Sequence, residues 1–220
     1  MKFLLLFEST PLTLSIPLKA LTSQGKRLDV FCRMCKSCLM FDGKPTRDSV
    51  EAWFSANDNQ ISPLRVIIDG SLLGTDFLRE KFHSELAIAN LLKNIMKGTL
   101  QAPGILVEEL HPTTNLPIAY LEMVKQVKEQ ESRKIVLLHE TGTPMLIQAG
   151  TSVISKNLFI DNDIAVLIGN HLGFPNEIEK ELLQASDHVL CLSTKTPSEG
   201  SPAISYLGSH VIDMLHYFLA

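Results

Sequence analysis

Charged residues with helical spacing cluster early in the chain and could transfer a proton on a bound nucleic acid. Arg27, Asp29, Arg33 and Lys36 fall on the polar side of an expected helix, and Lys26 directly precedes them. A carboxylate such as Asp29 can accept a proton, and arginines can hold phosphates or a base edge. An ordinary charged helix surface carries the same residue types, with Asp29 and Arg33 as an i, i+4 pair worth about a few tenths of a kcal/mol. The sequence leaves both interpretations open.

Three cysteines in the same segment, Cys32, Cys35 and Cys38, have a spacing that could begin a zinc or iron–sulfur site. Such a site needs a fourth ligand, and Cys191, on an expected strand, is the remaining cysteine of the sequence. The three cysteines also follow the apolar stripe of the expected helix, and a free cysteine packs as a small hydrophobic residue. We therefore expect packing in the core and no metal.

The glycine-bracketed segment 169–173 lacks the spacing of a dinucleotide-binding fingerprint. The sequence also has no G-x-x-x-x-G-K-[ST] loop and no G-x-S-x-G elbow. These absences disfavour dinucleotide and triphosphate cofactors and a serine–histidine hydrolase. His171 is a candidate catalytic base, although a loop histidine is more often a hydrogen-bonding surface residue.

Three short apolar segments, 134–138, 164–168 and 188–192, each run into a loop rich in small or polar residues. Segments of this kind are typical of buried parallel strands, and ligands bind where the carboxyl ends of such strands converge. The third loop, 193–203, could wrap a neutral ligand such as an adenosyl group. We expect the three loops to share one pocket.

The pattern along the chain predicts one α/β domain over residues 1–220, with a mostly parallel sheet flanked by helices. The expected strands cover about 2–7, 50–56, 65–69, 105–109, 134–138, 164–168 and 188–192, and the expected helices about 27–41, 79–96, 118–130, 176–184 and 204–219.

Composition and charge narrow the class of protein. Hydrophobic residues make up 45% of the chain, enough for a sizeable core, and no apolar run reaches the roughly 20 residues of a membrane span. Segment 19–47 holds seven basic and two acidic residues, or +5, so the remainder of this chain of net charge −4 carries −9. Such asymmetry is typical of a local phosphate-binding surface. The cysteine usage favours a reducing cytoplasm, and the apolar start at 2–7 is shorter than a signal peptide requires.

Four segments in register resemble a known family. They are Gly25-Lys26-Arg27-Leu28-Asp29-Val30-Phe31-Cys32-Arg33, Leu138-His139-Glu140-x-Gly142, the stretch 167–173 and Gly208-Ser209-His210. In this order they are similar to the archaeal-type tRNA pseudouridine-54 N1-methyltransferases of the SPOUT superfamily, and the similarity covers nearly the whole chain.

The resemblance implies a carboxyl-terminal trefoil knot, a homodimer, and S-adenosyl-L-methionine bound in the knot loops. The dimer would form through the terminal helix and the helix that begins near Pro175. The resemblance also implies tRNA as substrate. Because they lie in the basic segment and on the polar helix face, we expect Asp29, Arg27 and Arg33 to be catalytic and Lys26, Arg27, Arg33 and Lys36 to contact the RNA. The residues implied to contact the cofactor are Leu138, Gly169, Leu192, Ser193, Ala203, Ile204, Ser205, Tyr206 and Val211.

The chain departs from the family pattern at three places. Asn170 replaces an acidic residue, Val211 replaces a cysteine, and the third loop is longer. Val211 can still pack on an adenine, whereas Asn170 bears on the rate or the target nucleotide. Two alternatives follow, namely a SPOUT methyltransferase for another RNA such as ribosomal RNA, and an inactive cofactor-binding RNA partner.

Overall fold

The computed structural model describes residues 1–8, 12, 18–19, 21, 27–56, 62–144, 147–148, 151–152, 163–170, 173–191, 212–213 and 216. The seven strands of its main sheet are β1 (Lys2–Phe7), β4 (Ser49–Phe54), β5 (Leu64–Asp69), β6 (Ile105–Glu109), β7 (Lys134–Pro144), β10 (Ile164–Ile168) and β11 (His188–Cys191). The helices are α1 (Leu28–Leu39), α2 (Thr75–Lys81), α3 (Glu85–Met96), α4 (Leu116–Gln130) and α5 (Asn176–Ala185). Two short hairpins pair β2 (Met40–Phe41) with β3 (Lys44–Pro45) and β8 (Ile147–Gln148) with β9 (Thr151–Ser152).

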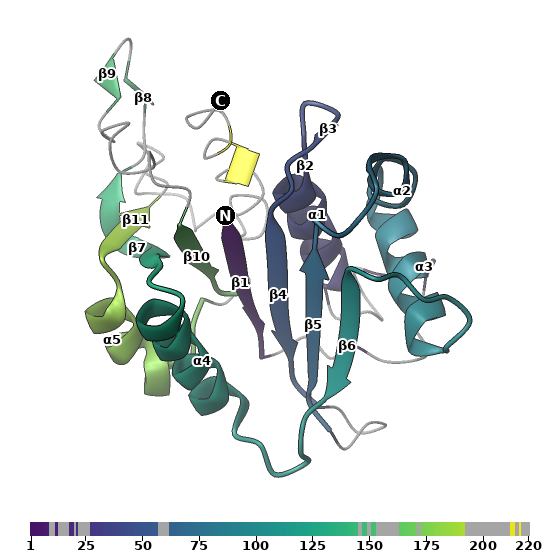
Figure 1. Ribbon diagram of the computed structural model, residues 1–220. Helices are drawn as coiled ribbons and strands as arrows, with labels where there is room; N and C mark the ends of the chain where they lie inside the picture. The colour runs from purple at the N-terminus through teal and green to yellow at the C-terminus, as the bar shows by residue number, and fades with distance from the viewer. Residues whose placement is uncertain are drawn as a thin grey trace.

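The main sheet has the order β11-β7-β10-β1-β4-β5-β6. The strands from β11 to β4 are parallel to one another, while β5 is antiparallel to both of its neighbours. The predicted fold class, a mostly parallel sheet flanked by helices, is confirmed. Figure 1 shows α4 and α5 together beside β7 and β10, with α1, α2 and α3 on the other side of the sheet.

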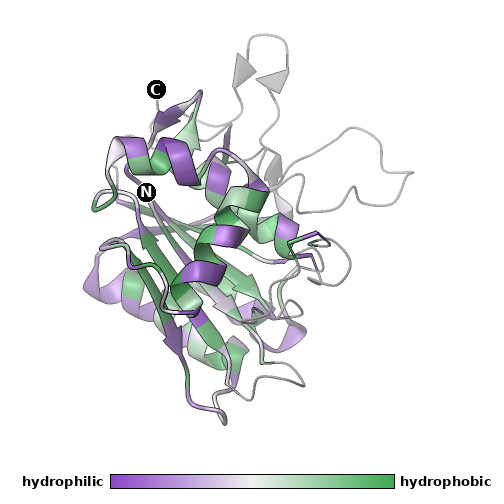
Figure 2. Ribbon diagram, turned by 90° about the vertical axis from the view of Figure 1, so that its right-hand side faces the viewer, coloured by the Kyte–Doolittle hydropathy of each residue, from purple (hydrophilic) through white to green (hydrophobic). Residues whose placement is uncertain are grey.

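The two faces of the sheet bury two separate hydrophobic clusters because successive side chains of a strand point to opposite faces. In β1, Phe3, Leu5 and Phe7 pack toward α1 and α3, whereas Leu4 and Leu6 pack toward α4 and α5. All five of these β1 side chains are at most 1% exposed. Figure 2 shows the result, with hydrophobic strands between helices that carry hydrophilic residues on their outer sides.

Two local features differ from the sequence-based expectation. The helix predicted at 79–96 is wrong at its start, because the chain forms α2 and then α3, separated at Phe82–Ser84. The Ser84 side chain accepts a hydrogen bond from the Ala87 backbone N–H at 3.2 Å and so caps α3. The hairpin β2–β3 was missed, although Asp42 and Gly43, with φ of 48° and 70°, form an Asp-Gly turn.

Helix α1 runs opposite to the parallel strands and thus positions its first turn near their carboxyl ends. The Phe31 ring lies 5.6 Å from Phe7 and 4.9 Å from Phe54, which are the last residues of β1 and β4. At the other end of α1, the Leu39 carbonyl accepts a hydrogen bond from Thr46 N–H, just before β4 starts. Residues 27–29 therefore lie at the carboxyl edge of the sheet, by which we mean the edge where the parallel strands end.

The described part of the chain's end packs on the α1 side. Ile212 belongs to the same cluster as α1, and the His216 ring lies 6.0 Å from Phe3 and 5.5 Å from Phe41. The rest of the predicted helix 204–219 lies outside the described residues, as does segment 192–211, on which the predicted knot depends. Among the described residues, no helix has both the length and the apolar character needed to cross a membrane.

Candidate active site at the carboxyl edge of the sheet

Three strands that were expected to share a pocket do lie side by side. Strand β7 pairs in parallel with β10 on one side, with Leu137 opposite Leu167, and with β11 on the other, with Leu137 opposite Val189. Leu138 is the next residue of β7, and Gly169 directly follows Ile168, the last residue of β10; these two are the described members of the expected cofactor set. They therefore lie near each other at the carboxyl edge.

A tight turn closes the end of β10. Gly173 N–H donates to the Asn170 carbonyl at 3.0 Å, and Gly173 has a φ of 89°, which a glycine adopts without strain. A Cβ added at Gly169 would lie 2.6 Å from the carbonyl carbon and oxygen of Gly173. Glycine at 169 is thus required by the turn itself. Asn170 is 3% exposed, so the residue that departs from the family pattern lies inside this turn.

A bulge extends β7 beyond the predicted end at 138. Val189 and Leu190 are consecutive residues of β11, yet they pair with Leu137 and Thr143 of β7. The five residues between these two partners, 138–142, leave the ladder. A Cβ added at Gly142 would lie 2.5 to 2.7 Å from backbone atoms of Leu190, so close backbone contact closes the base of the bulge.

Asp29 lies in a chain of ion pairs at the start of α1. Arg27 donates from Nε to Oδ1 and from Nη2 to Oδ2 of Asp29, both at 3.2 Å. Arg33 Nη2 lies 3.5 Å from Oδ2 of Asp29, and Arg33 Nε donates to Oε1 of Glu85 on α3 at 2.9 Å. The expected i, i+4 pair between Asp29 and Arg33 is confirmed. The placement of Asp29 on an open polar face is wrong, because the arginines cover its carboxylate and leave 2% exposed.

Arg27 adopts an uncommon backbone conformation. Its φ of 70° and ψ of 30° place it in the left-handed region at the N-cap of α1, which costs a non-glycine residue about 1 to 2 kcal/mol. The two-pronged contact with Asp29 offsets this cost. Its side chain stays 37% exposed, so part of the guanidinium faces outward at the carboxyl edge. Strained residues held in this way are frequent at active sites.

The three clustered cysteines pack in the core as expected. Cys32, Cys35 and Cys38 are each 0% exposed and lie with α1 in the cluster around Phe31. Desolvation by burial raises the pKa of all three thiols. Within the described ranges, no three His, Cys, Asp or Glu residues gather into a group that could hold a metal ion.

Of the other predicted site residues, the structure describes Lys36 and leaves the rest undescribed. Lys36 is exposed on α1, on the same helix as Arg33. The sequence reasoning missed Glu85 and Glu179 and gave no role to His139, which lies in a segment that resembles the family. The partners of these residues lie between 40 and 52 residues away, and no local spacing indicates them. Outside the described residues lie Lys26, His171, Leu192, Ser193, Ala203, Ile204, Ser205, Tyr206 and Val211.

In comparisons with known proteins, the chain is similar to solved structures only. Neither a protein-family model nor a curated protein sequence matches the chain. Among solved structures, Archaeoglobus fulgidus Nep1 bound to S-adenosylhomocysteine has 17% identity and a TM-score of 0.49, over 99% of this chain and 97% of that chain.

Two further solved structures are similar at 9% identity. One is a putative RNA methyltransferase of the TrmH family from Porphyromonas gingivalis, with a TM-score of 0.41 over 99% of this chain. The other is the SpoU methyltransferase AviRb from Streptomyces viridochromogenes in complex with the cofactor AdoMet, with a TM-score of 0.40 over 98% of this chain. The present chain spans 58% of the length of each of these two.

Proposed function

We propose that this protein is a SPOUT-type RNA methyltransferase that transfers a methyl group from S-adenosyl-L-methionine to N1 of pseudouridine 54 in the T-loop of tRNA. One observation carries the proposal: the Gly169 turn, the β7 bulge and the Arg27–Asp29 pair all lie at the carboxyl edge of one parallel sheet. These are three of the segments in which the sequence resembles the tRNA pseudouridine methyltransferases. The fold therefore supports one site made of segments far apart in the chain.

Two features at the carboxyl edge support a cofactor site there. Leu138 packs toward the α1 side of the sheet, and Gly169 allows the backbone to turn tightly at the end of the neighbouring strand. We assign Leu138 and Gly169 to the cofactor, together with Leu192, Ser193, Val211 and residues 203–206. When bound, S-adenosylmethionine supplies an electrophilic methyl group on a sulfonium, and the protein has to hold it against the base and exclude water.

We assign the removal of the pseudouridine N1 proton to Asp29. Pseudouridine, unlike uridine, presents an N1–H that a carboxylate can take, and positive charge stabilises the anion that develops. Arg27 covers Asp29 in the free protein, so the pseudouridine base must share or displace one of the Arg27 contacts to reach the carboxylate. Arg27 then stays beside the developing negative charge. Arg33, tied to both Asp29 and Glu85, maintains the position of the carboxylate.

We assign RNA binding to Lys36, which is exposed on α1, to the outward part of Arg27, and to Lys26, which precedes Arg27 in the sequence. Arg33 contributes less net charge to this surface than the sequence suggests, because Asp29 and Glu85 both pair with it. Phosphate contacts of this type position an RNA without reading its sequence. The choice of nucleotide then depends on the shape of the site at the carboxyl edge.

The experiment is methyl transfer from labelled S-adenosylmethionine to purified RNAs, followed by nuclease digestion and mass spectrometry of the nucleosides. We expect one labelled 1-methylpseudouridine per tRNA, in the fragment that contains position 54. Transfer to ribosomal RNA with none to tRNA would contradict the proposed target and show that the enzyme modifies ribosomal RNA. Cofactor binding without transfer to any RNA would indicate an inactive RNA-binding partner.

A further inference from the structure

His139 lies within the β7 bulge and has partners on both of its ring nitrogens. Its Nε2 lies 2.6 Å from Oε1 of Glu179, in the first turn of α5. Its Nδ1 lies 2.8 Å from Oγ1 of Thr141 and accepts a hydrogen bond from the Thr141 backbone N–H at 3.2 Å. The His139 side chain is 10% exposed, so these contacts hold it against the protein.

These partners select one tautomer of the imidazole ring. Because the Thr141 N–H donates to Nδ1, that nitrogen has to be an acceptor without a proton. A neutral ring then carries its proton on Nε2 and donates it to the Glu179 carboxylate. In this state both ring nitrogens are satisfied, and the hydrogen bond to a charged acceptor is of the stronger class.

The bulge depends on these side-chain contacts because the strand ladder does not hold it. Residues 138–142 fall between the two β7 positions that pair with β11. Leu138 anchors one end in the hydrophobic cluster on the α1 side, and Gly142 closes the other end against Leu190. His139 connects the middle of the bulge to α5, which packs beside β7 on the opposite face (Figure 1). Two successive residues, Leu138 and His139, therefore hold the bulge from opposite faces of the sheet.

We propose that His139 is a positioning residue that, through Glu179 and Thr141, fixes the shape of the β7 bulge for binding of the adenosyl cofactor. The proposal rests on the proposed function and deepens it. Helix α5 begins at Asn176, three residues after Gly173, so the contact between Glu179 and His139 joins the helix that follows the β10 turn to the bulge at the end of β7. Ligand binding at this edge requires both segments in place at once, and a preorganised pair of loops avoids the ordering cost on binding.

Nuclear magnetic resonance of the histidine ring nitrogens tests the geometry with no ligand present. We expect the neutral His139 ring to carry its proton on Nε2 and to accept at Nδ1. In Glu179→Ala the Nε2 proton should lose its protection from exchange with solvent. A neutral ring that carries its proton on Nδ1 in the wild-type protein would overturn the proposal.

Calorimetric titration with S-adenosylhomocysteine tests the consequence. Glu179→Ala should weaken binding about tenfold or more, because a charged hydrogen-bond acceptor is lost. Glu179→Gln keeps an acceptor oxygen in the same place, so its affinity should stay within about threefold of wild type. Glu177→Ala removes an exposed carboxylate from the same turn of α5 and serves as the matched control, with affinity unchanged.

The outcomes separate this proposal from the function on which it rests. Wild-type protein that fails to bind S-adenosylhomocysteine would overturn both. Wild-type binding together with unchanged affinity in Glu179→Ala would overturn the role of His139 alone. Equal losses in Glu179→Ala and Glu179→Gln would also contradict it, since the glutamine retains the acceptor. Melting temperatures of all variants verify that each protein is folded.

Discussion

Asp29 is a buried carboxylate with arginine contacts on both oxygens, and this arrangement limits what it can do in the free protein. Arg27 and Arg33 supply the positive charge that a buried carboxylate requires, and the acid lies in the first turn of α1, where the helix dipole favours it. A structural role would need no more than this. Two further features, the strained backbone of Arg27 and its partly exposed guanidinium, are not required by a structural role and favour a functional one.

At the residue scale, Asp29→Asn should lower the turnover number for methyl transfer at least about 100-fold, because an amide cannot accept the N1 proton. Affinity for tRNA and for cofactor should change much less, so the effect should fall on kcat and not on KM. Steady-state kinetics with pseudouridylated tRNA measures both. Asp42→Asn, at an exposed carboxylate in the β2–β3 turn, is the matched control. Full turnover in Asp29→Asn would show that another group, such as His171, takes the proton.

At the element scale, the strands at 2–7, 105–109 and 164–168 were predicted with the bounds that the structure has, since each contains a run of three or more consecutive apolar residues. Helix α1 was predicted to within two residues at its carboxyl end, but the burial of Asp29 was not. That burial depends on the way Arg27 folds back and on Glu85 of α3, and neither contact has a local signature in the sequence. The β7 bulge was missed for the same reason, because its register is set by β11, about 50 residues away.

Gly142→Ala should destabilise the protein by about 2 kcal/mol or more, because the added methyl would meet the Leu190 backbone and the bulge could not close. Thermal unfolding should show this as a drop of several degrees in Tm. Gly74→Ala is the matched control. Gly74 has a φ of −64° and nothing within 4 Å of an added Cβ, so its Tm should stay within about 1 degree of wild type. Equal melting temperatures for the two variants would contradict the close packing of the bulge.

The α1 cysteines should be inert in the folded protein, since burial both shields the thiols and raises their pKa. In a Cys191→Ser background, Ellman's reagent at pH 8 should label less than about one tenth of Cys32, Cys35 and Cys38 in native protein, and all three after denaturation. Complete labelling within minutes in native protein would show that α1 does not pack on the sheet as described. Elemental analysis of the same sample reports directly on zinc or iron.

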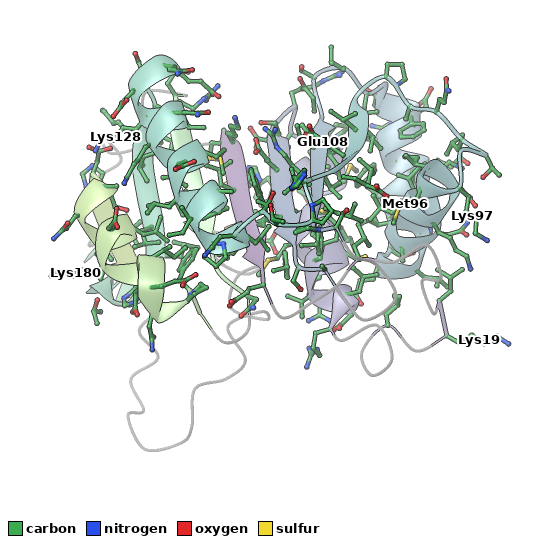
Figure 3. The ribbon with its side chains drawn as sticks, turned by 90° about the horizontal axis from the view of Figure 1, so that it is seen from below. Lys19, Met96, Lys97, Glu108, Lys128 and Lys180 are labelled. Carbon is green, nitrogen blue, oxygen red and sulfur yellow. The ribbon has the colours of Figure 1, made fainter. Side chains whose placement is uncertain are left out.

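At the scale of the whole molecule, the helices α4 and α5 lie on one side of the sheet and α1 to α3 on the other, with the proposed site at the edge between them. Figure 3 shows Lys128 and Lys180, of α4 and α5, at one end of the molecule and Met96 and Lys97, at the end of α3, at the other. The proposed site lies between them, where the parallel strands end. Helix α5 contributes to the bulge through Glu179, and it is also one of the two helices through which we expect a dimer to form.

We expect a homodimer that uses α5 and the terminal helix, because this would place the cofactor loops of each subunit beside the interface. Light scattering at micromolar concentration should give a mass near twice the 24.4 kDa of the chain. Substitution of Lys97, an exposed residue that directly follows α3, by glutamate should leave that mass unchanged. A monomer at these concentrations would contradict the proposed assembly.

The most direct test of the proposed function compares two tRNA transcripts that differ in one nucleotide, uridine or pseudouridine at position 54. With labelled S-adenosylmethionine, wild-type protein should transfer about one methyl group to the pseudouridine transcript and essentially none to the uridine transcript, because uridine offers no N1–H for Asp29 to remove. Equal transfer to both transcripts, or transfer to neither, would contradict the assignment of this protein as a tRNA pseudouridine N1-methyltransferase.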